Sequence, residues 1–154
     1  MKSQLQYAAA AFAIAFLPTS ASATGGLNCG IHDANLDFEF EALYNYAGTS
    51  PLMQIRGEFA AKSPKAYPTL KKFPIERGDL IQQWFEAKDL KLQFYRETTG
   101  DNVPHAAVKL TIEAVSGDDE IGYEGNYTLV VTPAVADSES ELITLNGKVG
   151  CSAG

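Results

Sequence analysis

The sequence predicts an all-β, mainly antiparallel domain: a β-sandwich of about seven strands with one short helix near residues 79–88. Three observations support this fold class. Apolar and polar residues alternate with a period of two along most of the chain, as in strands with one buried and one solvated face. Segments rich in Gly, Asn, Asp, Ser and Pro separate these runs and are typical of turns. The two cysteines, Cys29 and Cys151, lie near the two ends of the domain.

Residues 1–23 have the three parts of a cleavable secretory signal peptide. Lys2 gives a positive start, the run from Tyr7 to Leu17 is apolar, and Ala21-Ser22-Ala23 places the cleavage site after Ala23. An uncleaved anchor is the alternative, but a spanning helix needs about 20 apolar residues, more than this run supplies. Lipid attachment at Cys29 is a second alternative, which Asn28 directly before it disfavours. We therefore expect a periplasmic or secreted protein without a transmembrane anchor after processing.

Size and charge limit the classes of partner. Cleavage leaves residues 24–154, the length of a single ordinary domain. The full chain carries a formal charge of −7, and loss of Lys2 makes the mature part more acidic by one charge. Nucleic acid is not expected as a partner, because binding to phosphates requires a basic surface.

Seven segments of the mature chain have the alternation of strands. In the clearest one, Leu36, Phe38, Phe40, Ala42 and Tyr44 share one face, and acidic residues occupy the other. The predicted strands are 27–31, 36–46, 53–59, 90–94, 108–112, 121–131 and 143–149.

The cysteines fit this pattern of strands. Cys29 is in phase with Leu27 and Ile31, and Cys151 is in phase with Val149, so both thiols should point inward from the first and last strands. An even number of cysteines in an exported chain predicts a disulfide. The alternative is two free thiols, as in a reducing cytosol, which conflicts with the predicted signal peptide. In the chain-entropy model, a disulfide that closes a loop of this length stabilises the fold by about 4–5 kcal/mol.

One segment departs from the period of two. Between Asp79 and Lys88, the apolar residues Leu80, Ile81, Trp84 and Phe85 recur with helical spacing, and Asp79 is suitable as the N-cap. These features predict a short helix lying across a sheet. The alternative is a strand that runs from residue 80 to residue 97.

Residues for catalysis or metal binding are sparse in this sequence. The chain has two histidines, His32 and His105, and no G-x-S-x-G or H-E-x-x-H motif. Cys29 and His32 form a lone C-x-x-H, without the further ligands that tetrahedral zinc needs. The acidic turns lack the spaced ligands of a calcium loop, and no glycine-rich phosphate loop is present. We therefore predict no catalytic residues, no metal ligands and no cofactor.

The segment 61–78, which we call the basic segment, is the most unusual part of the sequence. Its local charge is about +4, and its three prolines predict a stiff, extended loop without regular structure. Long loops of this kind are often functional. The alternative is a simple crossover between two sheets, with its aromatic residues packed on the core. The candidate binding residues are Lys62, Lys65, Tyr67, Lys71, Lys72, Phe73 and Arg77.

These observations predict a non-enzymatic binding or accessory module of the cell envelope, with the basic segment as its contact surface. Cations interleaved with aromatic rings suit an anionic envelope component or an acidic protein surface. Two alternatives stay open: a small extracellular hydrolase or enzyme inhibitor, and a structural envelope protein that associates with itself through sheet edges.

Overall fold

The computed structural model describes residues 24–45, 51–86, 88–118, 121–134 and 141–154. The predicted signal peptide, residues 1–23, lies outside these ranges. Within them, no helix has the length and apolar character needed to span a membrane.

The described residues form nine strands, which pair into one antiparallel sheet in the order β4-β3-β2-β1-β9-β8-β7-β6-β5. A short helix and a 3-10 turn interrupt the chain between β3 and β5. The elements are β1 (Thr24–His32), β2 (Leu36–Asn45), β3 (Met53–Ala61), α1 (Pro68–Lys71), β4 (Lys72–Pro74), η1 (Arg77–Asp79), β5 (Leu80–Glu86), β6 (Asp89–Glu97), β7 (Ala107–Ser116), β8 (Gly122–Thr132) and β9 (Ile143–Ala153).

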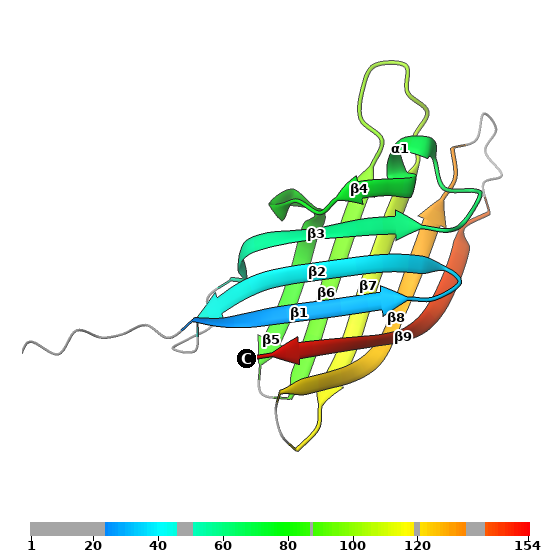
Figure 1. Cartoon of the computed structure of the whole chain (residues 1–154). Coiled ribbons are helices and arrows are strands. Elements are labelled where there is room, and N and C mark those ends of the chain that lie inside the picture. The colour runs from blue at the N-terminus through cyan, green and yellow to red at the C-terminus, as the bar shows by residue number, and fades with distance from the viewer. Residues whose placement is uncertain (1–23, 46–50, 87, 119–120, 135–140) are drawn as a thin grey trace, which may run out of the picture.

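The sheet curls over on itself, so that its two halves face one another as a half-barrel. In Figure 1, β1–β4 cross in front of β5–β8. The core lies between the halves: the rings of Phe38 and Phe40 on β2 pack edge-on against Phe94 on β6, with centroids 5.2 and 5.0 Å apart. The prediction of an all-β, antiparallel protein is thus confirmed. The finer expectation of a seven-stranded sandwich is not confirmed, because the strands described here form one continuous sheet.

The alternating pattern places the core residues of β2 correctly, whereas Met53 and Ile121, which it also puts inward, are exposed. On β2, the five predicted inward residues from Leu36 to Tyr44 are all buried, and Glu39 and Glu41 between them are exposed. Each of the seven predicted segments coincides with a strand to within one residue at the predicted ends, namely β1, β2, β3, β6, β7, β8 or β9; residue 46, the predicted end of the second segment, lies outside the described residues. A period of two is a reliable signal in β2 because that strand has one face against the core and the other toward solvent.

The predicted helix at 79–88 was wrong, because residues 80–86 form strand β5 and pair with β6. A register shift between Leu80 and Gln82 explains the error. This irregularity makes Leu80 and Phe85 both face the core, although an odd number of positions separates them. The resulting spacing imitates a helical stripe. The alternative of one strand from 80 to 97 was also inexact, because β5 ends at Glu86 and β6 begins at Asp89.

The two halves of the sheet join at β1 and β9, and this junction is short. In the described structure β1 pairs with β9 over Leu27–Gly30, whereas β8 pairs with β9 over the ten residues from Gly122 to Val131. The disulfide Cys29–Cys151 lies within the short junction, where the two cysteines are direct partners with Cα atoms 4.1 Å apart. The predicted bridge is therefore confirmed. Gly26 and Gly154 extend the junction by exchanging backbone hydrogen bonds.

A second contact, made by Arg96, joins β6 to η1 and to the edge strand β4 of the opposite half of the sheet. Arg96 on β6 donates two hydrogen bonds to Asp79, from Nε to Oδ1 (2.7 Å) and from Nη2 to Oδ2 (2.6 Å). Its guanidinium carbon lies 4.2 Å from the ring centroid of Phe73 on β4, and Nη2 also reaches the Pro74 carbonyl. Asp79 is buried. Planar, two-point pairing between guanidinium and carboxylate is the strongest form of this interaction.

We expect replacement of both cysteines, Cys29→Ser with Cys151→Ser, to lower the free energy of unfolding by about 4–5 kcal/mol, because the bridge joins residues 122 positions apart and so closes a long loop. Urea unfolding with and without a reductant measures this. The reductant should destabilise the natural protein and leave the double variant unchanged. A loss below about 1 kcal/mol would show that the β1–β9 junction holds without the bridge.

We expect Asp79→Asn to cost about 2–3 kcal/mol, because it leaves the Arg96 charge without its partner in a partly buried position. Glu41→Gln is the matched control: it breaks the exposed pair with Arg56, whose atoms are 3.0 Å apart, and should cost less than about 1 kcal/mol. Equal losses in thermal or urea unfolding would contradict a stabilising role for the Asp79–Arg96 pair.

Candidate functional site

The basic segment is folded rather than extended. The expectation of a loop without regular structure was wrong, because α1, β4 and η1 occupy much of it. Its apolar residues anchor it to the core: Leu70, Phe73 and Ile75 are buried, and the Phe73 ring stacks on Phe59 with centroids 4.7 Å apart. Phe73 therefore packs inside the molecule, as in the crossover alternative, and Tyr67 is half-buried.

The cations of this segment differ in their contacts. Lys62 bonds to Asp37, Lys72 pairs with Glu58, and Arg77 donates to the Leu52 carbonyl. In the part of the chain that the structure describes, Lys65 and Lys71 are exposed and make no ion pair. These two are the cations most available to an anionic partner. Binding by the basic segment stays a prediction.

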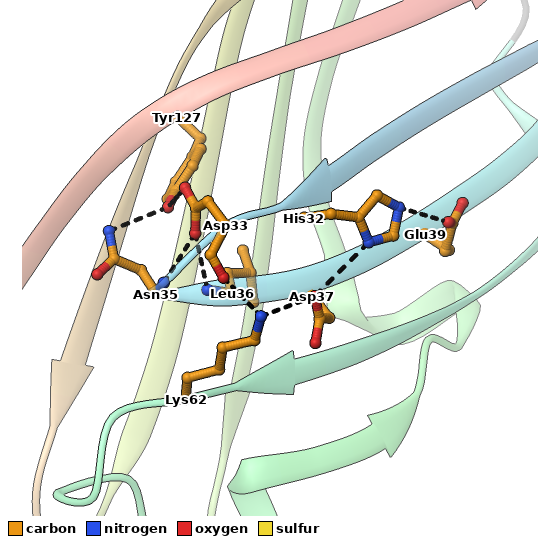
Figure 2. A network of polar contacts seen from close by, with 8 residues as sticks. All are labelled: His32, Asp33, Asn35, Leu36, Asp37, Glu39, Lys62 and Tyr127. Carbon is orange, nitrogen blue, oxygen red and sulfur yellow. Dashed lines mark hydrogen bonds and ion pairs between the residues drawn. The ribbon is translucent and has the colours of Figure 1, made fainter.

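A polar network fixes the hairpin turn between β1 and β2 against β8 (Figure 2). The Asp33 carboxylate accepts hydrogen bonds from the backbone N–H groups of Asn35 and Leu36 and from the hydroxyl of Tyr127, the last at 2.5 Å. The Asn35 amide donates to the same hydroxyl at 3.3 Å. Lys62 on the chain after β3 donates to the Asp33 carbonyl. Residues that are far apart in the sequence thus hold one turn.

The proton affinities follow from these contacts. Partial burial pushes the pKa of Asp33 upward, but the hydrogen bonds from Tyr127 and from the turn outweigh it and leave the pKa below its usual value. Burial, together with the bond to Asp33, raises the pKa of Tyr127 to about 12. A hydrogen bond from Lys62 lowers the pKa of Asp37. The network therefore favours an ionised Asp33 beside a neutral Tyr127.

A glycine on the neighbouring strand makes room for this pair. Gly147 on β9 is the register partner of Tyr127. A Cβ atom at Gly147 would overlap the Tyr127 ring and the Asp33 carboxylate. The close approach, and not a special backbone angle, explains glycine at this position.

The histidines have acidic neighbours but no nucleophile. His32 lies between Glu39 (Nε2 to Oε1, 2.8 Å) and Asp37 (Nδ1 to Oδ1, 3.6 Å), and its side chain is 60 % exposed. His105 is 3.9 Å from Glu97. Among the described residues, neither imidazole contacts a serine or cysteine, and no group of three or more His, Cys, Asp and Glu side chains is arranged to hold a metal ion. These geometries support ion pairing of the two imidazoles with carboxylates.

An open groove of about 860 Å³ lies over β5, β6 and β7. We call it the Trp84 groove. Trp84 and Ile81 on β5 are about half exposed, at 54 % and 49 %, and both line this groove. The groove is lined by Ile81, Gln82, Gln83, Trp84, Asp89, Lys91, Leu92, Gln93, Thr111 and Glu113.

Polar side chains cross the floor of this groove in two rows, set by strand register. Gln82 lies beside Gln93, which lies beside Thr111, and the Gln93 amide donates to the Thr111 hydroxyl at 3.0 Å. In the next row Lys91 lies beside both Trp84 and Glu113, and the Lys91–Glu113 ion pair spans 3.6 Å. The groove therefore combines an apolar rim with amide, hydroxyl and neutralised charged groups.

Sequence reasoning missed this groove because it assigned Trp84 to a helix facing a sheet. A signal was present: Gln82, Trp84 and Glu86 alternate with the more inward residues Gln83 and Phe85. Read as a strand, the segment places Trp84 on the solvated face.

We expect Tyr127→Phe to raise the pKa of Asp33 toward its ordinary value and to destabilise the protein by about 1.5–3 kcal/mol at neutral pH. Because the pKa of Asp33 is lowered in the folded state, its stabilisation exists above pH 3.8 and is lost on acidification. Because the pKa of Tyr127 is raised, its contribution is lost as the pH rises from 10 toward 12. The cost of the variant should therefore shrink at both pH extremes.

Carbon-detected NMR titration of the Asp33 carboxylate, with unfolding measured at several pH values, checks this prediction. Tyr95→Phe is the control, because it removes an exposed bond to Glu97 and should change stability by less than about 0.5 kcal/mol. An unchanged Asp33 titration in Tyr127→Phe would contradict the assignment.

Comparison with known proteins adds no relative to this description. The chain matches no protein-family model, no curated protein and no solved structure. Its chemistry is therefore inferred from its own residues: the Asp33–Tyr127 network, the basic segment and the Trp84 groove.

Proposed function

We propose that this protein is an exported, non-enzymatic binding module that works in the periplasm or outside the cell, and that the Trp84 groove is its contact surface. The observation that carries the proposal is the exposure of Trp84 and Ile81 in a groove that is otherwise lined mainly by polar side chains. Binding sites typically combine a concave shape, apolar contact area and a few placed polar groups.

The position of the groove favours recognition. Its polar residues come from neighbouring strands of a hydrogen-bonded sheet, so their spacing is set before any ligand arrives. Preorganisation of this kind reduces the entropy lost on binding. Tryptophan at the edge of such a site supplies a large contact area with little rotamer freedom to lose.

The basic segment is a second candidate surface, which the exposure of Lys65 and Lys71 favours. Its partner would be an anionic envelope component or an acidic protein surface. Partner capture through the two surfaces should differ in its sensitivity to mutation and to salt. Capture through the groove depends on Trp84 and little on salt, whereas capture through Lys65 and Lys71 weakens as ionic strength rises.

We expect Trp84→Ala to reduce capture of the natural partner by more than about tenfold, since a few aromatic residues usually carry most of the binding energy of a contact surface. The measurement is cross-linking of the tagged mature protein in its native envelope fraction, followed by quantification of the captured material. Thermal stability should change little, because Trp84 is largely exposed.

Two further variants complete the design. Leu142→Ala removes an equally exposed apolar side chain outside the groove, at 57 % exposure, and should leave capture unchanged. Lys65→Glu with Lys71→Glu tests the basic segment. Loss of capture in the lysine variant, with full capture by Trp84→Ala, would assign the contact to the basic segment and contradict the groove.

A further inference from the structure

We infer that the ligand of the Trp84 groove is a neutral glycan, whose sugar ring stacks on Trp84 and whose hydroxyl groups bond to the Gln93–Thr111 row. This inference rests on the proposed binding role of the groove and names the class of ligand. Three features of the described residues carry it: the exposed indole, the uncharged polar row and the local charge balance.

Trp84 offers the surface on which a sugar ring packs. It is the single tryptophan of the chain, and its side chain is 54 % exposed at the rim of the groove. The faces of pyranose rings carry C–H groups, which pack on the electron-rich face of an indole, while the hydroxyl groups at the ring edge stay free to form hydrogen bonds. An indole with one side in water suits such an amphipathic ligand better than a wholly apolar one.

The polar row supplies donors and acceptors of the kind that hydroxyl groups need. Gln82, Gln93 and Thr111 are register neighbours on three strands, about 4.8 Å apart from strand to strand. Each amide has both donor and acceptor atoms, and each hydroxyl can take either role. The Gln93–Thr111 bond leaves a second amide hydrogen and the amide oxygen of Gln93 for a ligand.

The charge of the groove argues against an anionic ligand. Lys91 is the only cation among its lining residues, and it already pairs with Glu113 at 3.6 Å. Asp89 adds a negative charge in the same lining. A phosphate, sulfate or uronate would therefore meet a net negative surface without a free cation. A neutral oligosaccharide avoids this electrostatic repulsion.

Because the chain has a single tryptophan, tryptophan fluorescence reports on this groove alone. The probes are a panel of neutral oligosaccharides built from glucose, galactose, mannose and N-acetylhexosamines, with heparin and polygalacturonate as anionic counterparts. We expect a saturable change in Trp84 emission with at least one neutral oligosaccharide and none with the anionic probes.

Thr111→Val, which keeps the side-chain shape, should weaken this binding about three- to tenfold through loss of one hydroxyl contact. Thr128→Val is the matched control: Thr128 is the register partner of Thr111 on β8 and does not line the groove. Its variant should bind with unchanged affinity. Equal effects of the two variants would overturn the role of the polar row.

Other occupants give different results, and each overturns the inference. No response across the neutral panel, a response only to the anionic probes, or a blue shift only with phosphatidylcholine vesicles would exclude a neutral glycan. Light scattering that shows a dimer dissociated by Trp84→Ala would identify a second copy as the occupant. If these tests fail while Trp84→Ala still abolishes capture in the envelope fraction, the binding role of the groove stands without the glycan.

Discussion

The fold depends on the junction between β1 and β9, where the Cys29–Cys151 bridge joins the first and last strands. This is the place where the N-terminal strands meet the C-terminal ones in the sheet, and the described register pairs four residues on each strand there. Short pairing between distant segments gives few hydrogen bonds for a large loss of chain entropy. A covalent bond at this position offsets that loss in the unfolded state. The prediction of an export signal and the presence of this bridge are mutually consistent.

Closure at this junction determines which surfaces the sheet presents. The curl directs Phe38, Phe40 and Phe94 inward, and Arg96 on β6 contacts Phe73 on β4, the edge strand of the opposite half. The outer side of β5–β7 remains uncovered by any other described element, and the Trp84 groove lies there. Among the aromatic residues that the structure describes, most pack in the core, and only Trp84, on the edge strand, is more exposed than buried. An exposed tryptophan on a rigid sheet is the feature that most needs a functional explanation.

Much of the fold was predictable from local pattern, and the rest was not, for identifiable reasons. Alternation placed the core residues of β2 correctly because both faces of that strand have constant environments. It failed at β5 because the irregularity beside Leu80 shifts the phase by one residue. The Asp33–Tyr127 bond joins residues 94 positions apart, and no local pattern encodes such a pair. The basic segment was singled out by composition, yet Phe73 is buried by Phe59 and Arg96, which only tertiary contacts decide.

The central claim is that the groove over β5–β7 is the contact surface of this protein, and Trp84 allows it to be tested at one residue. Oxidative footprinting of the mature protein, read by mass spectrometry, measures the reactivity of the Trp84 side chain before and after incubation with the native envelope fraction. The account predicts that Trp84 becomes protected in the captured protein, while exposed Met53, which does not line the groove, stays as reactive as before. Capture with full reactivity of Trp84 would contradict the claim.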